Sequence, residues 1–261
     1  MDATATPIVC PHLFLSGSAR CTASDLLRWA GLADLADSGT DAIAFCIRRV
    51  RAEQVLLREG QAFENLYFVG AGSFKSVQVD LEGYEQVLGF AIHGDALGLD
   101  GLLHGRHASG ATALEDSSVA VAPFRQLVEM SHTVPAIERL LQHATGAELM
   151  HRSDTQYLMS APSSEVRVAR FLLHFAQRQS ALGHSDRRLC LRMTRREIAS
   201  CLGVAHETVS RALTSLMNCG CIRVSQRDIE IVDADALHQL QRVTRGAPRG
   251  RLTHGPRALA A

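Results

Sequence analysis

The sequence contains no long hydrophobic run, although 46% of its 261 residues are hydrophobic. A membrane-spanning helix needs about 18 or more consecutive apolar residues, so no membrane segment is expected. Residues 1–11 also lack the basic and then apolar segments of a secretory signal. We therefore expect a cytoplasmic protein of one or two domains, each long enough to bury a core.

Cysteines at metal-ligand spacing are also missing. The seven cysteines are odd in number and scattered, and no two of them form a Cys-x-x-Cys motif. An odd count in a reducing compartment argues against a disulfide framework. Cys219 and Cys221 are separated by a single residue, a poor spacing for two ligands of one zinc ion. We predict no metal site.

Catalytic motifs are absent as well. The sequence contains no phosphate-binding loop and no nucleophile–base signature, and scattered Ser, His and Asp residues are not a triad without geometry. We expect that the protein is not an enzyme. An enzyme, or a cyclic-nucleotide-regulated enzyme subunit, is the alternative class.

The formal net charge is +0, but the charge is unevenly distributed. Residues 162–261 carry 16 basic and 8 acidic residues, whereas residues 1–161 carry 11 basic and 19 acidic residues. A basic C-terminal third suggests contact with a polyanion such as nucleic acid. Chance segregation in a two-domain protein is the alternative.

Strand patterns dominate the first half of the chain. Between residues 51 and 124, short apolar runs (QVLL, LYFVG, VQVD, VLGFAI, SSVAVAPF) alternate with glycine-containing turns. This spacing favours an antiparallel β-sandwich or roll. Residues 1–24 lack periodicity and are interpreted as an extended arm, and residues 25–34 are expected to form a short amphipathic helix.

A long helix is predicted over residues 135–161, bounded by a proline in its first turn and by Pro162. At 1.5 Å per residue it is long enough for a dimerising strut, but an ordinary core helix remains open. A second helix is expected over residues 164–179.

The strongest pattern lies near residue 200. Thr194 and Glu197 form a capping box before a short helix, and Gly203 supplies the turn. A second helix over residues 206–218 ends before Gly220. Two short helices joined by such a turn are typical of a helix-turn-helix, although structural look-alikes exist.

The flanking sequence supports this interpretation. Two short strands, residues 221–224 and 229–232, surround a polar turn and form a wing. The second helix would pack through Val209, Leu213 and Leu216. Its opposite face would carry His206, Glu207, Ser210 and Arg211, near the helix start where such proteins contact bases.

The segment MTRREIASCLGVAHETVSRALTSLMNCGCI closely resembles the helix-turn-helix of the CRP/FNR superfamily of bacterial transcription regulators. HGDALGLDGLL resembles the family's glycine–acid turn, and VPAIERLLQH resembles the start of its dimerisation helix. The resemblance covers about residues 45–240. It implies an α+β fold: an antiparallel, cyclic-nucleotide-binding-like β-roll, a long dimerisation helix and a C-terminal winged helix-turn-helix, acting as a homodimer.

Taken together, these patterns and the resemblance divide the chain into five segments. They are an arm (1–24), a β-roll effector domain (25–130), a dimerisation helix (131–161), a winged helix-turn-helix domain (162–245) and a basic tail (246–261) that is expected to be disordered.

Within the recognition helix, Glu207, Ser210 and Arg211 match the Glu-x-x-Ser-Arg pattern of the FNR branch. The resemblance implies a TTGAT half-site in the palindrome TTGAT-N4-ATCAA. The chemistry is consistent, because Arg211 can donate to guanine O6 and N7 while Glu207 accepts from cytosine N4. Ser210 would contact a thymine.

Phosphate contacts are expected from residues around the two helix starts. For Arg195, Arg196 and His206 a solvated surface role is equally open. The full set is Thr194, Arg195, Arg196, His206 and Thr208.

Dimerisation residues are assigned along the long helix. Arg152 would lie near its counterpart in the family register, and like charges at a two-fold axis would make dimerisation conditional. The full set is Ile137, Leu141, Ala144, Leu149 and Arg152.

Comparison with the family's sensor residues narrows the effectors to which this regulator could respond. Cyclic nucleotide binding needs an arginine beside the serine that clamps the phosphate, but Arg106 is displaced by about three positions from Ser109. An FNR-type [4Fe–4S] cluster needs four thiolates. The arm holds only Cys10 and Cys21, and Ala120 stands at the fourth position. We expect neither cAMP nor this cluster.

Other signals stay open. Cys10 and Cys21 could form a thiol switch, whereas Cys201 is interpreted as a small core residue. Haem is a minor alternative through the pair His104-x-x-His107, and an effector-independent regulator or repressor is another. RNA polymerase is an expected partner, through the turn at residues 82–84.

Overall fold

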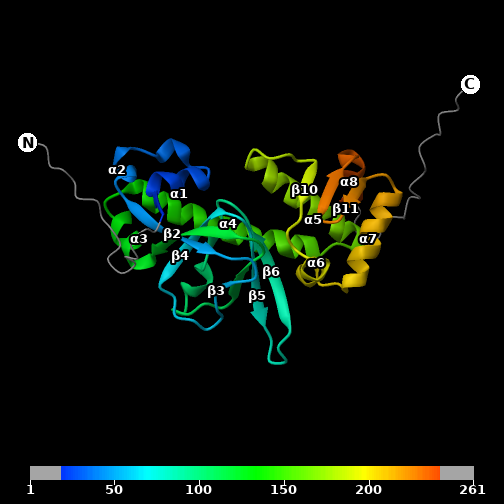
Figure 1. The fold of residues 1–261 in the computed structure, drawn as a ribbon, viewed down its shortest axis with the longest axis horizontal. Coiled ribbons are helices and arrows are strands. Elements are labelled where there is room, and N and C mark those ends of the chain that lie inside the picture. The colour runs from blue at the N-terminus through cyan, green and yellow to red at the C-terminus, as the bar shows by residue number, and fades with distance from the viewer. Residues whose placement is uncertain (1–18, 242–261) are drawn as a thin grey trace, which may run out of the picture. The chain divides into compact units, whose positions relative to one another are not determined.

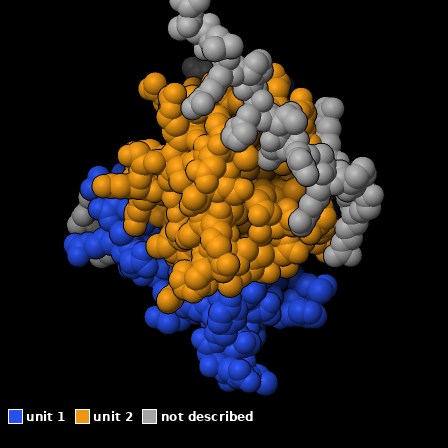
Figure 2. Space-filling model, turned by 90° about the vertical axis from the view of Figure 1, so that its right-hand side faces the viewer, with its two compact units in different colours: residues 1–154 blue, residues 155–261 orange. Residues whose placement is uncertain are grey.

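The computed structural model describes residues 19–241, which divide into two compact units. The first unit ends at Asp154 and the second begins at Thr155, as the colours of Figure 2 show. Most of the predicted arm, including Cys10, and the whole of the basic tail lie outside the described residues.

Two antiparallel sheets build the first unit (Figure 1). One sheet has the order β1-β2-β9-β4-β7 and the other has the order β3-β8-β5-β6. The strands are β1 Arg20–Thr22, β2 Ala44–Val50, β3 Val55–Leu57, β4 Asn65–Ala71, β5 Phe74–Val79, β6 Glu85–Ala91, β7 Ala96–Leu97, β8 Gly110–Ala113 and β9 Ser117–Pro123. The predicted antiparallel roll is therefore confirmed.

Strand β4 is apolar at consecutive positions because both of its faces are buried. Leu66 and Phe68 face a core shared with the helices, whereas Tyr67 and Val69 face a second core with the four-stranded sheet. Successive side chains of a strand point to opposite faces, so a strand buried on both sides loses the alternation of apolar and polar residues.

Helices cover the outer face of the five-stranded sheet. They are α1 Ala23–Trp29, α2 Ser38–Asp41, α3 Phe124–Ser131 and α4 Pro135–Met159, together with the 3-10 turns η1 Ala33–Leu35 and η2 Leu99–Gly101. Leu26 and Leu27 of α1, Leu127 of α3 and Ile137 of α4 belong to the same core cluster as Leu66 of β4.

The N-terminal segment differs from the prediction in two respects. Residues 20–22 form an edge strand and Ala23 already belongs to α1, so the extended arm was predicted to run too far. Helix α1 also begins earlier than residue 25 and ends at Trp29, because Thr22 caps it and Gly31 adopts φ 76° two residues after its end.

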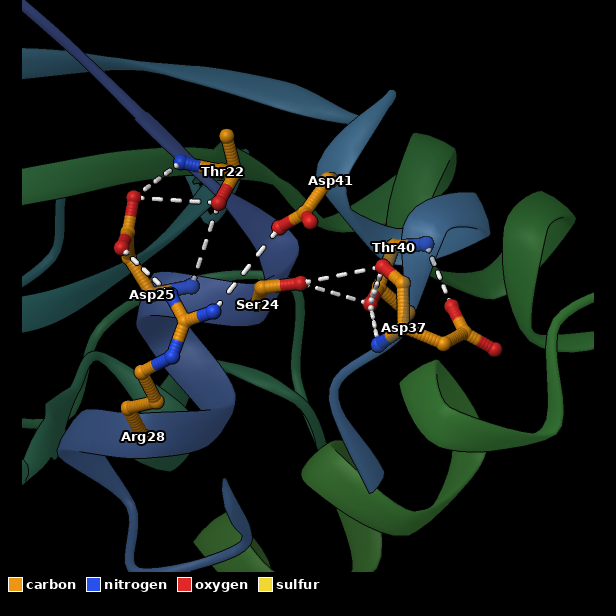
Figure 3. Close-up of polar contacts among 7 residues, drawn as sticks. All are labelled: Thr22, Ser24, Asp25, Arg28, Asp37, Thr40 and Asp41. Atoms are coloured by element: carbon orange, nitrogen blue, oxygen red, sulfur yellow. Dashed lines mark hydrogen bonds and ion pairs between the residues drawn. The ribbon is translucent and has the colours of Figure 1, made fainter. Parts of the chain in front are cut away.

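A polar network joins α1 to α2 (Figure 3). The hydroxyls of Ser24 and Thr40 lie 2.7 Å apart, and Asp37 caps α2 by accepting from the amide of Thr40 at 2.8 Å. Arg28 donates to Asp25 at 3.0 Å within α1. Asp37 thus satisfies an amide at the start of α2, and the contact between Ser24 and Thr40 joins the two helices.

The second unit contains α5 Ser164–Ala181, β10 Arg188–Cys190, α6 Arg195–Leu202, α7 His206–Asn218, β11 Ile222–Ser225, β12 Asp228–Ile231 and α8 Ala234–Gln241. The three strands form an antiparallel sheet in the order β10-β12-β11. The predicted helix-turn-helix and both wing strands are confirmed within one residue. Strand β10 and helix α8 were not predicted from the sequence.

Candidate nucleic-acid interface

Helix α6 begins as the sequence predicts. The Thr194 hydroxyl accepts from the amide of Glu197 at 3.2 Å, and the Glu197 carboxylate accepts from the amide of Thr194 at 2.6 Å. Ile198 and Leu202 are buried, which confirms their inward orientation. The capping box thus sets where the first helix of the motif starts.

The turn between α6 and α7 depends on Gly203. Its φ is 63°, and a Cβ at this position would lie 3.1 Å from Cε of Met159. Arg167 of α5 donates to the carbonyl oxygens of Leu202 at 3.0 Å and Gly203 at 3.3 Å. The turn is therefore held by a glycine conformation and by a cation at the C-terminal end of α6.

Helix α7 divides into two faces. Its buried face contains Val209, Ala212, Leu213 and Leu216, which pack in the second unit. The predicted base-contacting residues Glu207, Ser210 and Arg211 are all exposed on the other side, within the first two turns. The spacing of four residues from Glu207 to Arg211 places both on one face.

The polar contacts of this face are few. His206 Nε2 lies 3.3 Å from Glu207 Oε1, and the Ser210 hydroxyl donates to the carbonyl of His206 at 3.4 Å. Within residues 19–241, no hydrogen bond or ion pair engages the Arg211 guanidinium. Arg211 therefore presents its donors to solvent, ready for an external acceptor.

The predicted phosphate contacts differ in their surroundings. Arg196 and His206 are exposed, Thr208 is half-buried, and the Thr194 hydroxyl already takes part in the capping box. Arg195 is half-buried and donates from Nη2 to the carbonyl of Gln226 in the wing turn at 3.2 Å.

The predicted dimerisation residues divide along α4. Ile137 is 0% exposed, Ala144 is buried with it, and Leu141 packs against the same core, so these side chains belong to the interior of the first unit. Leu149 is 63% exposed. Arg152 is exposed and its Nε donates to Glu148 Oε1 at 2.8 Å, one turn away on the same helix. Of the predicted set, Leu149 and Arg152 are therefore the most accessible to a second chain.

Cys21, proposed as part of a thiol switch, and Cys201, predicted to be a core residue, are both buried. Burial raises the pKa of the Cys21 thiol to about 12 and that of Cys201 to about 12. A thiol reacts as its thiolate, so both are held in an unreactive form. Cys21 pairs with Phe45 across the sheet and points to the same face, whereas Cys46 points to the other, which prevents a bond between the two cysteines.

The loop of the roll that matches the phosphate clamp is occupied by its own carboxylate. Asp100 accepts from the amide and hydroxyl of Ser109, each at 2.7 Å, and lies 3.2 Å from Nδ1 of His107. The side chains of His107 and Asp100 are 1% and 9% exposed. Arg106 instead donates to the carbonyl of Gly60 at 2.8 Å.

The two histidines considered as haem ligands, His104 and His107, lie in different environments. His104 is exposed, whereas His107 is buried and packs edge-on against Phe63 with ring centroids 5.6 Å apart. Across residues 19–241, no group of three or more His, Cys, Asp or Glu residues is arranged to hold a metal ion.

Sequence reasoning missed several residues that shape these sites. Arg167 carries no motif of its own, and Asp100 lies within the glycine–acid segment but was given no role there; their partners lie 36 and 9 residues away along the chain, respectively. The contact between Arg195 and Gln226 spans 31 residues. The positive φ of Gln226 also has no sequence signal, because glutamine is not a residue that favours a left-handed turn position.

These features define a winged helix-turn-helix protein with an N-terminal roll of the cyclic-nucleotide-binding kind. Family models agree: residues 166–240 match a Crp-like helix-turn-helix domain and residues 47–133 match a cyclic nucleotide-binding domain. In the described part of the chain, no helix combines the length and hydropathy that crossing a bilayer requires.

The relatives identify the family. The chain is 36% identical to the transcriptional regulatory protein btr of Bordetella pertussis over 194 residues, 74% of this chain and 80% of the relative. It is 34% identical to the fumarate and nitrate reduction regulatory protein of Escherichia coli over 196 residues, covering 75% of this chain and 78% of the relative. The chain belongs to the CRP/FNR superfamily of DNA-binding transcription regulators.

A solved structure supports the same assignment. FixK2 from Bradyrhizobium japonicum superposes with a TM-score of 0.68 at 29% identity, covering 76% of this chain and 98% of that one. The predicted fold class, roll plus winged helix-turn-helix, is confirmed.

Proposed function

We propose that this regulator binds, as a cytoplasmic homodimer, an inverted repeat of the form TTGAT-N4-ATCAA, and that it catalyses no reaction. The observation that carries the proposal is the exposed face of α7, where Glu207, Ser210 and Arg211 lie together on the first two turns. Residues near the start of a recognition helix are the ones that reach base edges in the major groove.

Each of these residues has a definite chemical role. The guanidinium of Arg211 donates two hydrogen bonds to O6 and N7 of the guanine, and Glu207 accepts from the cytosine amino group of the opposite strand. The short side chain of Ser210 fits beside a thymine methyl group. His206, Thr208, Thr194 and Arg196 then contact phosphates, assisted by the helix N-termini.

A palindrome requires a two-fold symmetric protein. The apolar face of the first half of α4 packs in the core of the first unit, so the large exposed apolar side chains of the second half are the better candidates for the partner contact. Leu149 and Met150 are 63% and 61% exposed there. Apolar side chains of this size on a helix surface are suited to a second copy of the same helix.

We infer that the signal is neither cAMP nor an FNR-type iron–sulfur cluster. The donors of Ser109 that would hold a cyclic phosphate already bind Asp100, and Arg106 is engaged elsewhere. Strand β9 carries buried Ala120 where the fourth cluster thiolate would stand. Effector-independent binding follows most directly from this internally satisfied roll.

RNA polymerase is the proposed partner in activation. The hairpin of β5 and β6 ends in an exposed turn at residues 80–84, where Leu81 and Tyr84 are both exposed (Figure 1). The Asp80 carboxylate accepts from the amides of Glu82 and Tyr84, at 2.9 Å each, and so gives this tip a defined shape. Exposed apolar side chains on an ordered turn suit a protein contact.

The test is fluorescence anisotropy with a labelled TTGAT-N4-ATCAA duplex, in air and then without oxygen, with no ligand added. We expect tight binding in both conditions, and a loss of about 1–3 kcal/mol per half-site in Arg211→Ala. Changing the guanine of the half-site should weaken wild type strongly but Arg211→Ala little. Arg139→Ala, an exposed arginine of α4, is the control.

Each contrary result has a meaning. Equal binding of wild type to the palindrome and to a scrambled duplex would overturn the half-site. Binding that appears only without oxygen would show an oxygen-labile group. Binding that requires added cyclic nucleotide would overturn the proposed independence from that ligand.

A further inference from the structure

A side chain of the first helix of the motif makes a hydrogen bond to the wing. Arg195, in the first turn of α6, donates from Nη2 to the carbonyl oxygen of Gln226 at 3.2 Å. Burial lowers the pKa of the Arg195 guanidinium from its usual value. Its neighbour Arg196 is exposed, and within residues 19–241 no hydrogen bond or ion pair engages it. The two adjacent arginines therefore occupy different environments.

The wing turn that Arg195 contacts has a strained backbone. Strands β11 and β12 pair up to Ser225 and Asp228, which leaves Gln226 and Arg227 as a two-residue turn. Gln226 has a φ of 54°, in the left-handed region that favours glycine or asparagine. A turn of this kind keeps one shape only when its surroundings hold it.

Both carbonyl groups of the turn are held from outside the hairpin. Arg195 donates to the carbonyl of Gln226, and the amide of Leu191 donates to the carbonyl of Arg227 at 2.9 Å. The connection from β10 to α6 thus runs along the turn and fixes it. The side chain of Arg227 is exposed, and in the described part of the chain it has no hydrogen bond or ion pair.

We propose that Arg195 is a positioning residue, which holds the wing turn so that Arg227 contacts a DNA phosphate beside the half-site. The inference rests on the proposed function, in which the start of α6 and the exposed face of α7 meet a duplex. The hydrogen bond to Gln226 brings the wing turn next to the start of α6. Arg227 in this turn would then contact the same stretch of DNA phosphate backbone that the start of α6 approaches. Arg195 then acts through Arg227 instead of contacting a phosphate itself.

The two roles of Arg195 predict different salt dependences. Each phosphate contact adds about 0.9 to the slope of log affinity against log salt concentration. If Arg195 only positions Arg227, losing either residue removes the same contact. If Arg195 contacts its own phosphate, the two losses add.

The experiment is a double-mutant cycle on the full chain. Wild type, Arg195→Ala, Arg227→Ala and the double variant are titrated with a duplex containing the palindrome at several salt concentrations. We expect each single variant to have a slope shallower by about 0.9 per bound protomer, and the double variant to be no shallower than either. Arg139→Ala should leave the slope unchanged. Circular dichroism at the titration temperature confirms that every variant is folded.

Three outcomes would overturn the inference. A double variant whose slope falls by the sum of both single effects would show that Arg195 contacts a phosphate directly. An unchanged slope in Arg227→Ala would show that the wing turn does not touch DNA. A merely structural role of Arg195 would lower thermal stability without moving the slope, and this also counts against positioning.

The same cycle on a scrambled duplex separates this inference from the proposed function. A phosphate contact is independent of sequence, so the coupling between Arg195 and Arg227 should persist there. Loss of wild-type preference for the palindrome would refute the half-site while leaving the coupling intact. Preference without coupling would refute only the role of Arg195.

Discussion

Selected polar side chains of the roll and of the DNA-binding unit differ in burial and pairing. In the roll, Asp100 is almost fully buried and binds Ser109 and His107. In the second unit, Arg211 and Arg227 are exposed and, across residues 19–241, no ion pair or hydrogen bond engages them.

The difference indicates which unit needs a partner. Buried polar groups cost free energy unless they are paired, and Asp100 supplies that pairing from within the chain. Charged donors held on a helix face in solvent contribute little to folding but are ready for an external anion. The Ser109 loop of the roll is therefore satisfied from within the chain, whereas Arg211 and Arg227 are open to the DNA contacts that we propose.

The largest stability effect is expected from breaking the internal pairing of the roll. Asp100→Ala leaves the buried His107 and the Ser109 amide without their acceptor, and should cost about 2–3 kcal/mol. Urea unfolding followed by the fluorescence of Trp29, the only tryptophan and part of the first unit, measures this loss. DNA affinity of the folded variant should stay the same.

The control is Glu129→Ala, which removes an exposed carboxylate of α3. An Asp100→Ala variant as stable as wild type would mean that water replaces the carboxylate at no cost. A variant that gains affinity for cyclic nucleotide would show that Asp100 blocks a usable ligand site.

A smaller effect is expected at the turn of the DNA-binding unit. Gly203→Ala places a Cβ at a φ of 63° and 3.1 Å from Met159, and should destabilise the second unit by about 1–2 kcal/mol. Thermal unfolding followed by circular dichroism measures the loss, and DNA affinity near the midpoint falls with it.

Gly146→Ala is the matched control, because Gly146 lies within α4 and nothing approaches its Cβ position within 4 Å. This change should stabilise the protein by about 0.5–1 kcal/mol, as alanine favours a helix over glycine. If both substitutions had the same sign, the turn conformation of Gly203 would not matter.

The smallest effect is expected for Arg152. Arg152→Leu removes a charge from the proposed dimer surface, so it should tighten the dimer in analytical ultracentrifugation. The gain should be only a few-fold, because Glu148 already pairs with Arg152 at 2.8 Å. Arg139→Leu is the control, and an unchanged or weaker dimer in Arg152→Leu would argue against repulsion at the two-fold axis.

Local patterns in the sequence were enough for the helix-turn-helix. The Thr194–Glu197 box, Gly203 and the spacing of Val209, Leu213 and Leu216 each act over a few residues, so the start of α6, the turn and the buried face of α7 were all predicted correctly. The same spacing put Glu207, Ser210 and Arg211 on the exposed face.

Other elements were missed because their stability comes from contacts distant in sequence. Strand β10 has only three residues and exists because β12 pairs with it. The edge strand β1 is equally short and pairs with β2. Isolated strands of this length have no stability of their own.

The sequence by itself determined the family, the order of the two units and the exposed face of α7, because periodicity and capping are local properties of the chain. Only the tertiary structure decided that Ile137 and Ala144 belong to a core, that Asp100 fills the loop of the roll and that Arg195 holds the wing. In each case the deciding contact falls outside the short spacings of a helix or strand pattern, and only packing brings the residues together.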